Sequence, residues 1–186
     1  MSANAEVSKQ VDSYRFLDRL TRTLVQSWIE LEAQRDSTRE ILRDLPREIP
    51  WTPLSKPLAE SRVALISSAG LALKTDRPFD QGGERRNPWW GDPSYRILPR
   101  TATAEDVALY HLHIHPGVVG QDLNTLMPLE RLLELERRGE IGCSAPRHYS
   151  YMGYILQPQV LLEETVPAMI EHMRRDGVNV VVLVPG

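Results

Sequence analysis

The sequence predicts an α/β protein built on a mainly parallel open sheet with flanking helices. Short runs rich in apolar and β-branched residues occupy 62–67 and 178–184. Segments with the apolar spacing of helices lie between them, at 128–138 and 160–175. Strands that alternate with helices favour parallel pairing, because a helix is the usual crossover between parallel strands. The expected architecture is flavodoxin-like or Rossmann-like.

A long amphipathic helix is expected before this sheet, within 7–44. Apolar residues recur there at intervals of three and four, at Tyr14, Leu17, Leu20, Leu24, Trp28 and Leu31. Such a stripe must be covered by the rest of the chain or by another subunit, so we expect a homo-oligomer formed through this helix. Four prolines between residues 46 and 57 exclude helix or central strand and mark a linker. The expected organisation is a helical arm with a linker over 1–60 and one α/β domain over 61–186, incomplete at its carboxyl end.

The first part of that domain is expected to be a buried strand followed by a tight turn. The strand covers 62–67, and Gly70 supplies the turn. Residues 75–93 are rich in proline and glycine and form a long loop that contains Trp89 and Trp90. Two further strands are expected at 95–98 and 107–115.

The second part of the domain is expected to hold two helices and a final strand. Pro128 suits the first turn of the helix at 128–138, and Gly139 ends it. The helix at 160–175 leads into 178–184, where five of the seven residues are valine. A strand so apolar is expected at the centre of the sheet, covered on both faces.

Composition excludes several classes of function. With 22 basic and 25 acidic residues the net charge is −3, so the chain shows no electrostatic signature of a nucleic-acid or membrane-surface protein. Its apolar runs are far shorter than the roughly 20 residues of a membrane span, and it lacks a secretion signal. We therefore expect a cytoplasmic protein. Cys143 is the only cysteine, which excludes a disulfide within these residues and is typical of a small buried side chain.

Three histidines are the first candidates for chemistry. His111, His113 and His115 alternate along the strand expected at 107–115, so their side chains would share one face. Three imidazoles and the carboxylate of Asp122 are a ligand set that zinc or iron uses. Histidines held by ordinary hydrogen bonds at the end of a strand explain the pattern equally well.

Polar residues farther along the chain form a second group of candidates. Asp122 and Asn124 either cap the helix that follows or hold a small zwitterion near the histidines. Arg147 either clamps a substrate carboxylate or forms a surface salt bridge, and His148 adds a titratable ring beside it. Ligands of open α/β sheets bind beyond the carboxyl ends of the strands, where we expect these residues.

Several short motifs together resemble one enzyme family. They are Gly-Asp-Pro-Ser-Tyr-Arg at 91–96, His113 followed by Asp122 and Asn124, Pro-Leu-Glu-Arg-Leu at 128–132, Gly-Glu-Ile-Gly at 139–142, Tyr-Met-Gly at 151–153 and the apolar run that follows Asp176 and Gly177. Each motif is weak alone. In this order and spacing, over 62–186, the chain resembles protein B of the glycine/sarcosine/betaine/D-proline reductase family.

The resemblance implies reductive cleavage of a C–N bond in a small amino acid or betaine-like substrate. A selenocysteine or cysteine is the nucleophile in that family, and thioredoxin-like dithiols supply the electrons. Pocket residues implied by the match are His113, Asp122 and Asn124, with Arg147 and His148 as further candidates. His115 stands where many members have aspartate, which leaves D-proline, glycine and betaine all open as substrates.

The resemblance also places the nucleophile just beyond the apolar strand, hence just beyond Gly186. We therefore expect a chain that lacks its own nucleophile and is truncated at an unread selenocysteine codon. Two alternatives remain open: a metal-dependent enzyme that uses His111, His113, His115 and Asp122, and a non-catalytic subunit that binds a partner through the N-terminal helix.

Overall fold

The computed structural model describes residues 52–87, 91–115, 117–155 and 158–186, without the side chains of Glu84 and Val118. The helix expected at 7–44 and the pair Trp89 and Trp90 lie outside these residues. Pro53–Gly186 forms one compact unit.

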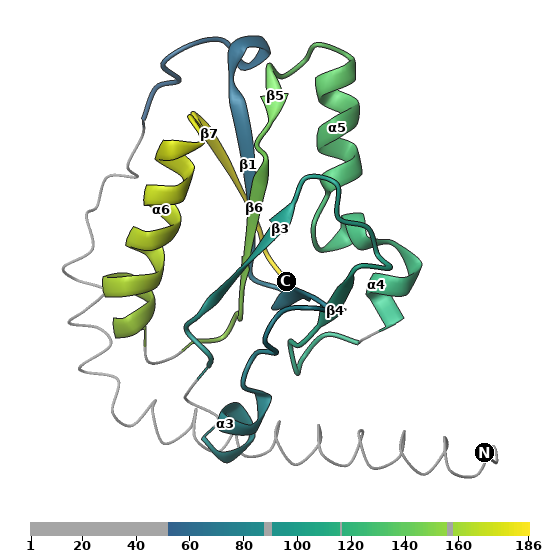
Figure 1. Ribbon diagram of the computed structural model, residues 1–186, viewed down its shortest axis with the longest axis vertical. Coiled ribbons are helices and arrows are strands. Elements are labelled where there is room, and N and C mark those ends of the chain that lie inside the picture. Colours follow the sequence, from purple (N-terminus) through teal and green to yellow (C-terminus); the bar gives the residue numbers. More distant parts are fainter. Residues whose placement is uncertain (1–51, 88–90, 116, 156–157) are drawn as a thin grey trace, which may run out of the picture. The chain divides into compact units, whose positions relative to one another are not determined.

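Pairs of strands are separated by helices along the chain (Figure 1). The strands are β1 (Arg62–Ser67), β2 (Leu71–Leu73), β3 (Tyr95–Pro99), β4 (Val107–Leu109), β5 (Cys143–Ser144), β6 (Arg147–Tyr151) and β7 (Val180–Val184). The helices are α3 (Gln81–Arg86), α4 (Gly117–Gln121), α5 (Leu129–Arg137) and α6 (Val166–Arg175). Shorter turns of helix are η1 (Leu58–Glu60), η2 (Leu123–Thr125) and the π-helical η3 (Leu161–Thr165).

Strand β1 is the centre of the larger sheet. Strands β5 and β6 pair in parallel with its two ends along one edge, and β7 pairs in parallel along the whole of the other edge. Strand β3 adds to β6 in the antiparallel direction, and β2 and β4 form a separate antiparallel pair. The α/β class predicted from the sequence is confirmed. The larger sheet is mixed, and three of its four strand pairs are parallel. The flavodoxin-like or Rossmann-like topology stays a prediction.

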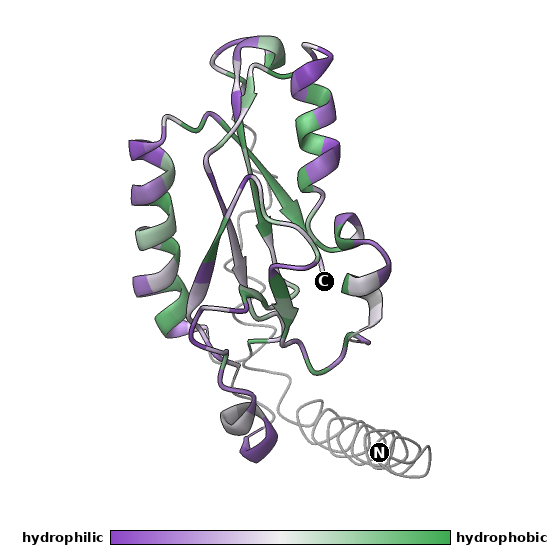
Figure 2. Cartoon of the chain, turned by 45° about the vertical axis from the view of Figure 1, so that its right-hand side comes forward, coloured by the Kyte–Doolittle hydropathy of each residue, from purple (hydrophilic) through white to green (hydrophobic). Residues whose placement is uncertain are grey.

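Helices cover both faces of this sheet because the side chains of β1 alternate between them. Val63 and Leu65 belong to the core that includes α5, and Ala64 belongs to the core that includes α6. Figure 1 shows α6 on one side of the strands and α5 on the other. Figure 2 shows apolar residues along the strands and polar residues on the outer sides of the helices. Each helix thus buries one apolar stripe, as its sequence pattern predicts.

The position expected for the last strand is wrong. Strand β7 lies at the edge of the described sheet, with β1 as its neighbour. Its side chains at Val181, Val182 and Leu183 are exposed, and Leu183 retains 73% of its accessible surface. Helix α6 packs over Ala64 and Tyr149 and does not cover this strand. An apolar run therefore indicates a strand here, but its hydrophobicity does not place the strand at the centre.

The strand expected at 107–115 is also shorter than predicted. Strand β4 ends at Leu109, and His111 and His113 lie in the turn that follows. Strand β6, which no sequence pattern predicted, joins β3 to β1. The loop expected at 75–93 contains the short helix α3, which Asp80 caps by accepting a hydrogen bond from the amide of Gly83.

His148 belongs to the core. Its side chain is 0% exposed, Nδ1 accepts a hydrogen bond from the amide of Leu65 at 3.0 Å, and Nε2 lies 3.0 Å from Oγ of Ser144. Because Nδ1 is an acceptor, Nε2 carries the ring proton. Burial lowers the pKa of the ring to about 4, so the ring is neutral at pH 7. His148 joins β6 to β1 inside the core, and its expected role in substrate binding stays a prediction.

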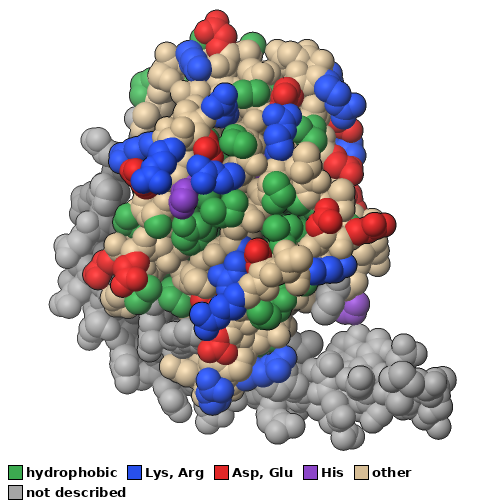
Figure 3. Space-filling model, viewed as in Figure 1, with side chains coloured by type: hydrophobic (Ala, Val, Ile, Leu, Met, Phe, Trp, Pro, Cys, Tyr) green, Lys and Arg blue, Asp and Glu red, His purple; other side chains and the backbone are tan. Residues whose placement is uncertain are grey.

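The surface seen in Figure 3 carries both signs of charge, with lysine and arginine interspersed among aspartate and glutamate and apolar groups between them. Among the described residues, no helix combines the length and the apolar composition needed to cross a bilayer.

Replacing Gly70 with alanine should destabilise the fold. Gly70 has φ of +64°, and an added Cβ would overlap Sδ of Met152 and lie 3.2 Å from the amide nitrogen of His111. We expect the free energy of unfolding in urea to fall by about 1–3 kcal/mol. Gly120 is the control, because its Cβ would meet no atom within 4 Å. Gly120→Ala lies in α4 and should be neutral or stabilise by up to about 1 kcal/mol; equal losses in the two variants would contradict this explanation.

Stability should fall on acidification partly through His148. Its pKa is about 4 in the folded chain and 6.5 in the unfolded chain, so below pH 6.5 only the unfolded chain takes up the proton. This uptake costs about 3 kcal/mol of stability between pH 6.5 and pH 4. His148→Asn keeps the acceptor for Leu65 and should shrink the acid-dependent loss by that amount, measured by urea unfolding at each pH. An unchanged slope in His148→Asn would refute the assignment.

Candidate functional site

Three parallel strands end at the same edge of the sheet and bring their following residues together. The amide of Ser68, after β1, donates to the carbonyl of Val184 in β7 at 3.1 Å. The amide of Gly153, after β6, donates to the carbonyl of Ser68 at 2.8 Å. Oγ of Ser68 accepts a hydrogen bond from the amide of Gly186 at 2.9 Å. This is the edge at which open α/β sheets bind ligands.

The turn after β4 contributes a fourth segment to this edge. The amide of Tyr110 donates to the carbonyl of Gly70 at 2.9 Å, which holds His111 next to the end of β6. A Cβ at position 153 would lie 3.0 Å from Nε2 of His111 and 3.0 Å from the carbonyl oxygen of Ser68. Glycine at this position therefore allows the histidine and the loop after β1 to approach closely.

Three aromatic rings form a continuous row here. The rings of His111 and His113 have centroids 5.5 Å apart, and the same distance separates His113 from Tyr154, both pairs meeting edge to face. Tyr154 has φ of 60°, in the left-handed region that non-glycine residues rarely adopt. Strained backbone of this kind concentrates at functional sites. We name Ser68, His111, His113 and Tyr154 the carboxyl-edge cluster.

The titratable groups of this cluster are neutral at pH 7. Burial, with a smaller effect of His113, lowers the pKa of His111 to about 4. Burial also lowers the pKa of His113 and raises the pKa of Tyr154. Nδ1 of His111 accepts a hydrogen bond from the amide of His113 at 3.2 Å, so its proton is on Nε2. The cluster thus offers neutral donors and acceptors that can bind a carboxylate or hold a proton.

The other predicted histidine and its carboxylate partner act as caps. Nδ1 of His115 accepts a hydrogen bond from the amide of Gly117 at the start of α4. Asp122 accepts from the amide and the side chain of Asn124, which lower the pKa of the carboxyl group, and Oδ1 of Asn124 accepts from the amide of Glu130 in α5. In the described part of the chain, no three His, Cys, Asp or Glu side chains form a group that could hold a metal ion. The set His111, His113, His115 and Asp122 is therefore not brought together.

Arg147 is engaged within the protein. Its Nε and Nη2 donate to the two carboxylate oxygens of Asp176, each at 2.7 Å, and Nη1 lies 3.0 Å from Nδ1 of His172. The ion pair lowers the pKa of Asp176. The expected clamp for a substrate carboxylate is therefore an internal ion pair that ties β6 to the end of α6.

The motif at 91–96 builds a rigid corner on the outer side of β3. The buried carboxylate of Asp92 accepts hydrogen bonds from the amide of Asp80 at 2.8 Å and from the amide and Oγ of Ser94 at 2.9 and 2.5 Å. Burial of Asp92 acts to raise its pKa, but these hydrogen bonds outweigh it and the pKa is lowered. The carboxylate is therefore ionised and joins two loops.

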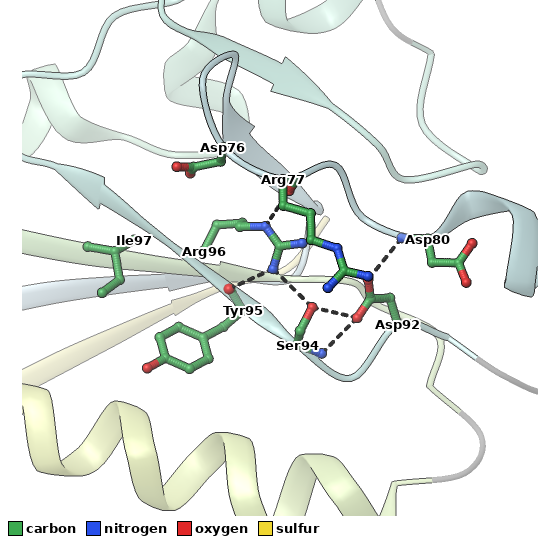
Figure 4. A pocket seen from close by; sticks show the side chains of 8 residues that line it. All are labelled: Asp76, Arg77, Asp80, Asp92, Ser94, Tyr95, Arg96 and Ile97. Carbon is green, nitrogen blue, oxygen red and sulfur yellow. Dashed lines mark hydrogen bonds between the residues drawn. The ribbon is translucent and has the colours of Figure 1, made fainter.

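Arg96 completes this corner. Its guanidinium donates to the carbonyls of Arg77 and Tyr95, both at 2.8 Å, and of Pro78 at 3.1 Å, and it stacks on Phe79 with 4.2 Å to the ring centroid. Beside it lies a pocket of about 630 Å³. Figure 4 shows its lining residues, which are Asp76, Arg77, Asp80, Asp92, Ser94, Tyr95, Arg96 and Ile97.

Sequence patterns indicate two members of the carboxyl-edge cluster and not the other two. His111 and His113 were predicted as candidates, although on a strand that ends before them. Ser68 and Tyr154 were not predicted. The signal for Ser68 was available, because it directly follows a buried strand of a parallel sheet. Nothing in the sequence around Tyr154 predicts its left-handed backbone conformation.

One comparison with known proteins identifies a relative. The chain is 31% identical over 136 residues to the D-proline reductase subunit gamma of Acetoanaerobium sticklandii. The match covers 73% of this chain and 53% of the relative, so the chain spans about half the length of that protein. No family model matches the chain, and no solved structure matches it. The chain is therefore similar to a D-proline reductase subunit, in agreement with the resemblance that the sequence motifs indicated.

Proposed function

We propose that this chain is part of a selenol- or thiol-dependent reductase that cleaves a C–N bond of a small amino acid or betaine-like substrate. The similarity to a D-proline reductase subunit supports the reaction class. The observation that carries the proposal is the row of neutral rings at the carboxyl ends of β1, β6 and β7. We propose that the substrate binds at this carboxyl-edge cluster, in the cytoplasm.

The cluster has the groups that such a substrate requires. Tyr154 keeps its proton because burial raises its pKa, and it can donate a hydrogen bond to the substrate carboxylate. His111 carries its proton on Nε2 and can donate in the same way. The nitrogen of an amino acid already carries its protons at pH 7, and His113, an exposed and neutral imidazole, can accept a hydrogen bond from it as the C–N bond breaks.

The nucleophile must come from outside this cluster. Cys143 pairs with Arg62 at the start of β1, whereas the cluster follows Ser67 at its end. Five residues of extended strand separate the two positions by roughly 16 Å. Sγ of Cys143 also accepts a hydrogen bond from Nε of Arg62 at 3.2 Å. We therefore propose that a selenocysteine or cysteine outside residues 1–186 supplies the electron pair and that a thioredoxin-like dithiol restores it.

Substitutions in the native reductase test this division of roles. In the complex that contains this chain, His113→Ala should lower kcat/KM for D-proline at least tenfold, because the departing nitrogen loses its hydrogen-bond acceptor. Cys143→Ser should leave kcat/KM within twofold, because serine can still accept from Arg62. The measurement is dithiol-dependent consumption of D-proline, glycine and betaine, which also identifies the substrate.

Two results would contradict the proposal. Loss of activity in Cys143→Ser, with the protein folded as judged by circular dichroism, would place the nucleophile at Cys143. Full activity in His113→Ala would remove the carboxyl-edge cluster from the reaction.

A further inference from the structure

We propose that the pocket between β3 and residues 76–80 binds a small zwitterion, with Arg77 holding its carboxylate and Asp76 and Asp80 holding its ammonium group. This pocket shares no lining residue with the carboxyl-edge cluster. The inference does not rest on the proposed function.

The two arginines of this pocket differ in what they are free to do. Every donor face of Arg96 is directed at the protein, through three carbonyl oxygens and Oγ of Ser94. Arg77 contributes its backbone carbonyl to that network. Its own guanidinium makes no hydrogen bond or ion pair with any residue that the structure describes, and it lines the pocket. A guanidinium with both edges available is suited to bind a carboxylate through two parallel hydrogen bonds.

The three carboxylates of the pocket also differ in how many of their oxygens accept hydrogen bonds from the protein. Both oxygens of Asp92 are used by amides and by Ser94. Asp76 accepts one hydrogen bond on Oδ2 from Leu73, and Asp80 accepts one on Oδ1 from Gly83. The second oxygen of Asp76 and of Asp80 has no donor within the described ranges. The pocket thus presents one available cation and two available anionic oxygens, which matches a ligand that carries both signs of charge.

The binding groups of this pocket lie on one face of β3. Tyr95 and Ile97 also line the pocket, but their side chains lie on the opposite face of β3 from Arg96 and pack toward α6. A ligand with a single charge would leave either Arg77 or the two aspartates without an oppositely charged partner in the ligand. The corner held by Asp92 and Arg96 fixes the loop before any ligand arrives, which lowers the entropic cost of binding.

Calorimetric titration with matched ligands tests the proposal. 4-Aminobutanoate should bind saturably to the intact chain and at least tenfold more tightly than butanoate or butylamine, which each lack one charge. Glycine and 5-aminopentanoate, as shorter and longer zwitterions, show which separation of charges the pocket prefers. Arg77→Gln should weaken the best zwitterion at least tenfold and leave butylamine unchanged. Asp80→Asn keeps the acceptor for Gly83 and should weaken the zwitterion without unfolding α3.

The control is Arg174→Gln, which removes an exposed arginine that does not line the pocket. It should bind the zwitterions like the wild type. The proposal is overturned if the dissociation constant of each of the three zwitterions exceeds about 10 mM, which corresponds to a binding free energy weaker than about −3 kcal/mol. It is equally overturned if butanoate binds as well as 4-aminobutanoate, or if Arg77→Gln binds like the wild type.

Discussion

Parallel pairing of β1 with both β6 and β7 is the constraint on which the rest of this structure depends. Ser67 is in register with Ser150 on one side and with Val184 on the other, so all three strands end together. The loops that follow are then forced to one edge, where Ser68, Gly153 and Gly186 are joined by hydrogen bonds. A slip of β7 along β1 would separate them. Backbone pairing, more than any single side chain, builds the carboxyl-edge cluster.

Local sequence patterns were sufficient to predict most helices and strands, but not which elements lie next to one another in the fold. Strand β1 and helix α5 were predicted closely, because an apolar run and helical periodicity are properties of the segment itself. Strand β6 was missed because His148 and Ser150 interrupt its apolar pattern, and their polarity is explained only by partners on β1 and β2. The edge position of β7 was mispredicted for the same reason, since what covers a strand is decided by distant residues.

The candidate site shows the same limit for individual side chains. Arg147 forms an ion pair with Asp176, which is 29 residues away. A short sequence motif around Arg147 cannot predict such a distant partner. Asp122 and Asn124 act as caps of η2 and α5, which is the simpler of the two roles predicted for them. His113 is part of the carboxyl-edge cluster, yet its neighbour Tyr154 comes from the far end of β6. Which polar residues are left available for a ligand depends on which ones the fold uses.

The central claim is that a small amino acid binds where β1, β6 and β7 end. An NMR titration of the intact, ¹⁵N-labelled chain with D-proline tests it most directly. We expect saturable shifts of the amide resonances of His113, Gly153 and Gly186, which come from three segments that only this fold brings together. If these three resonances stay fixed at saturating ligand, the carboxyl-edge cluster is not the binding site.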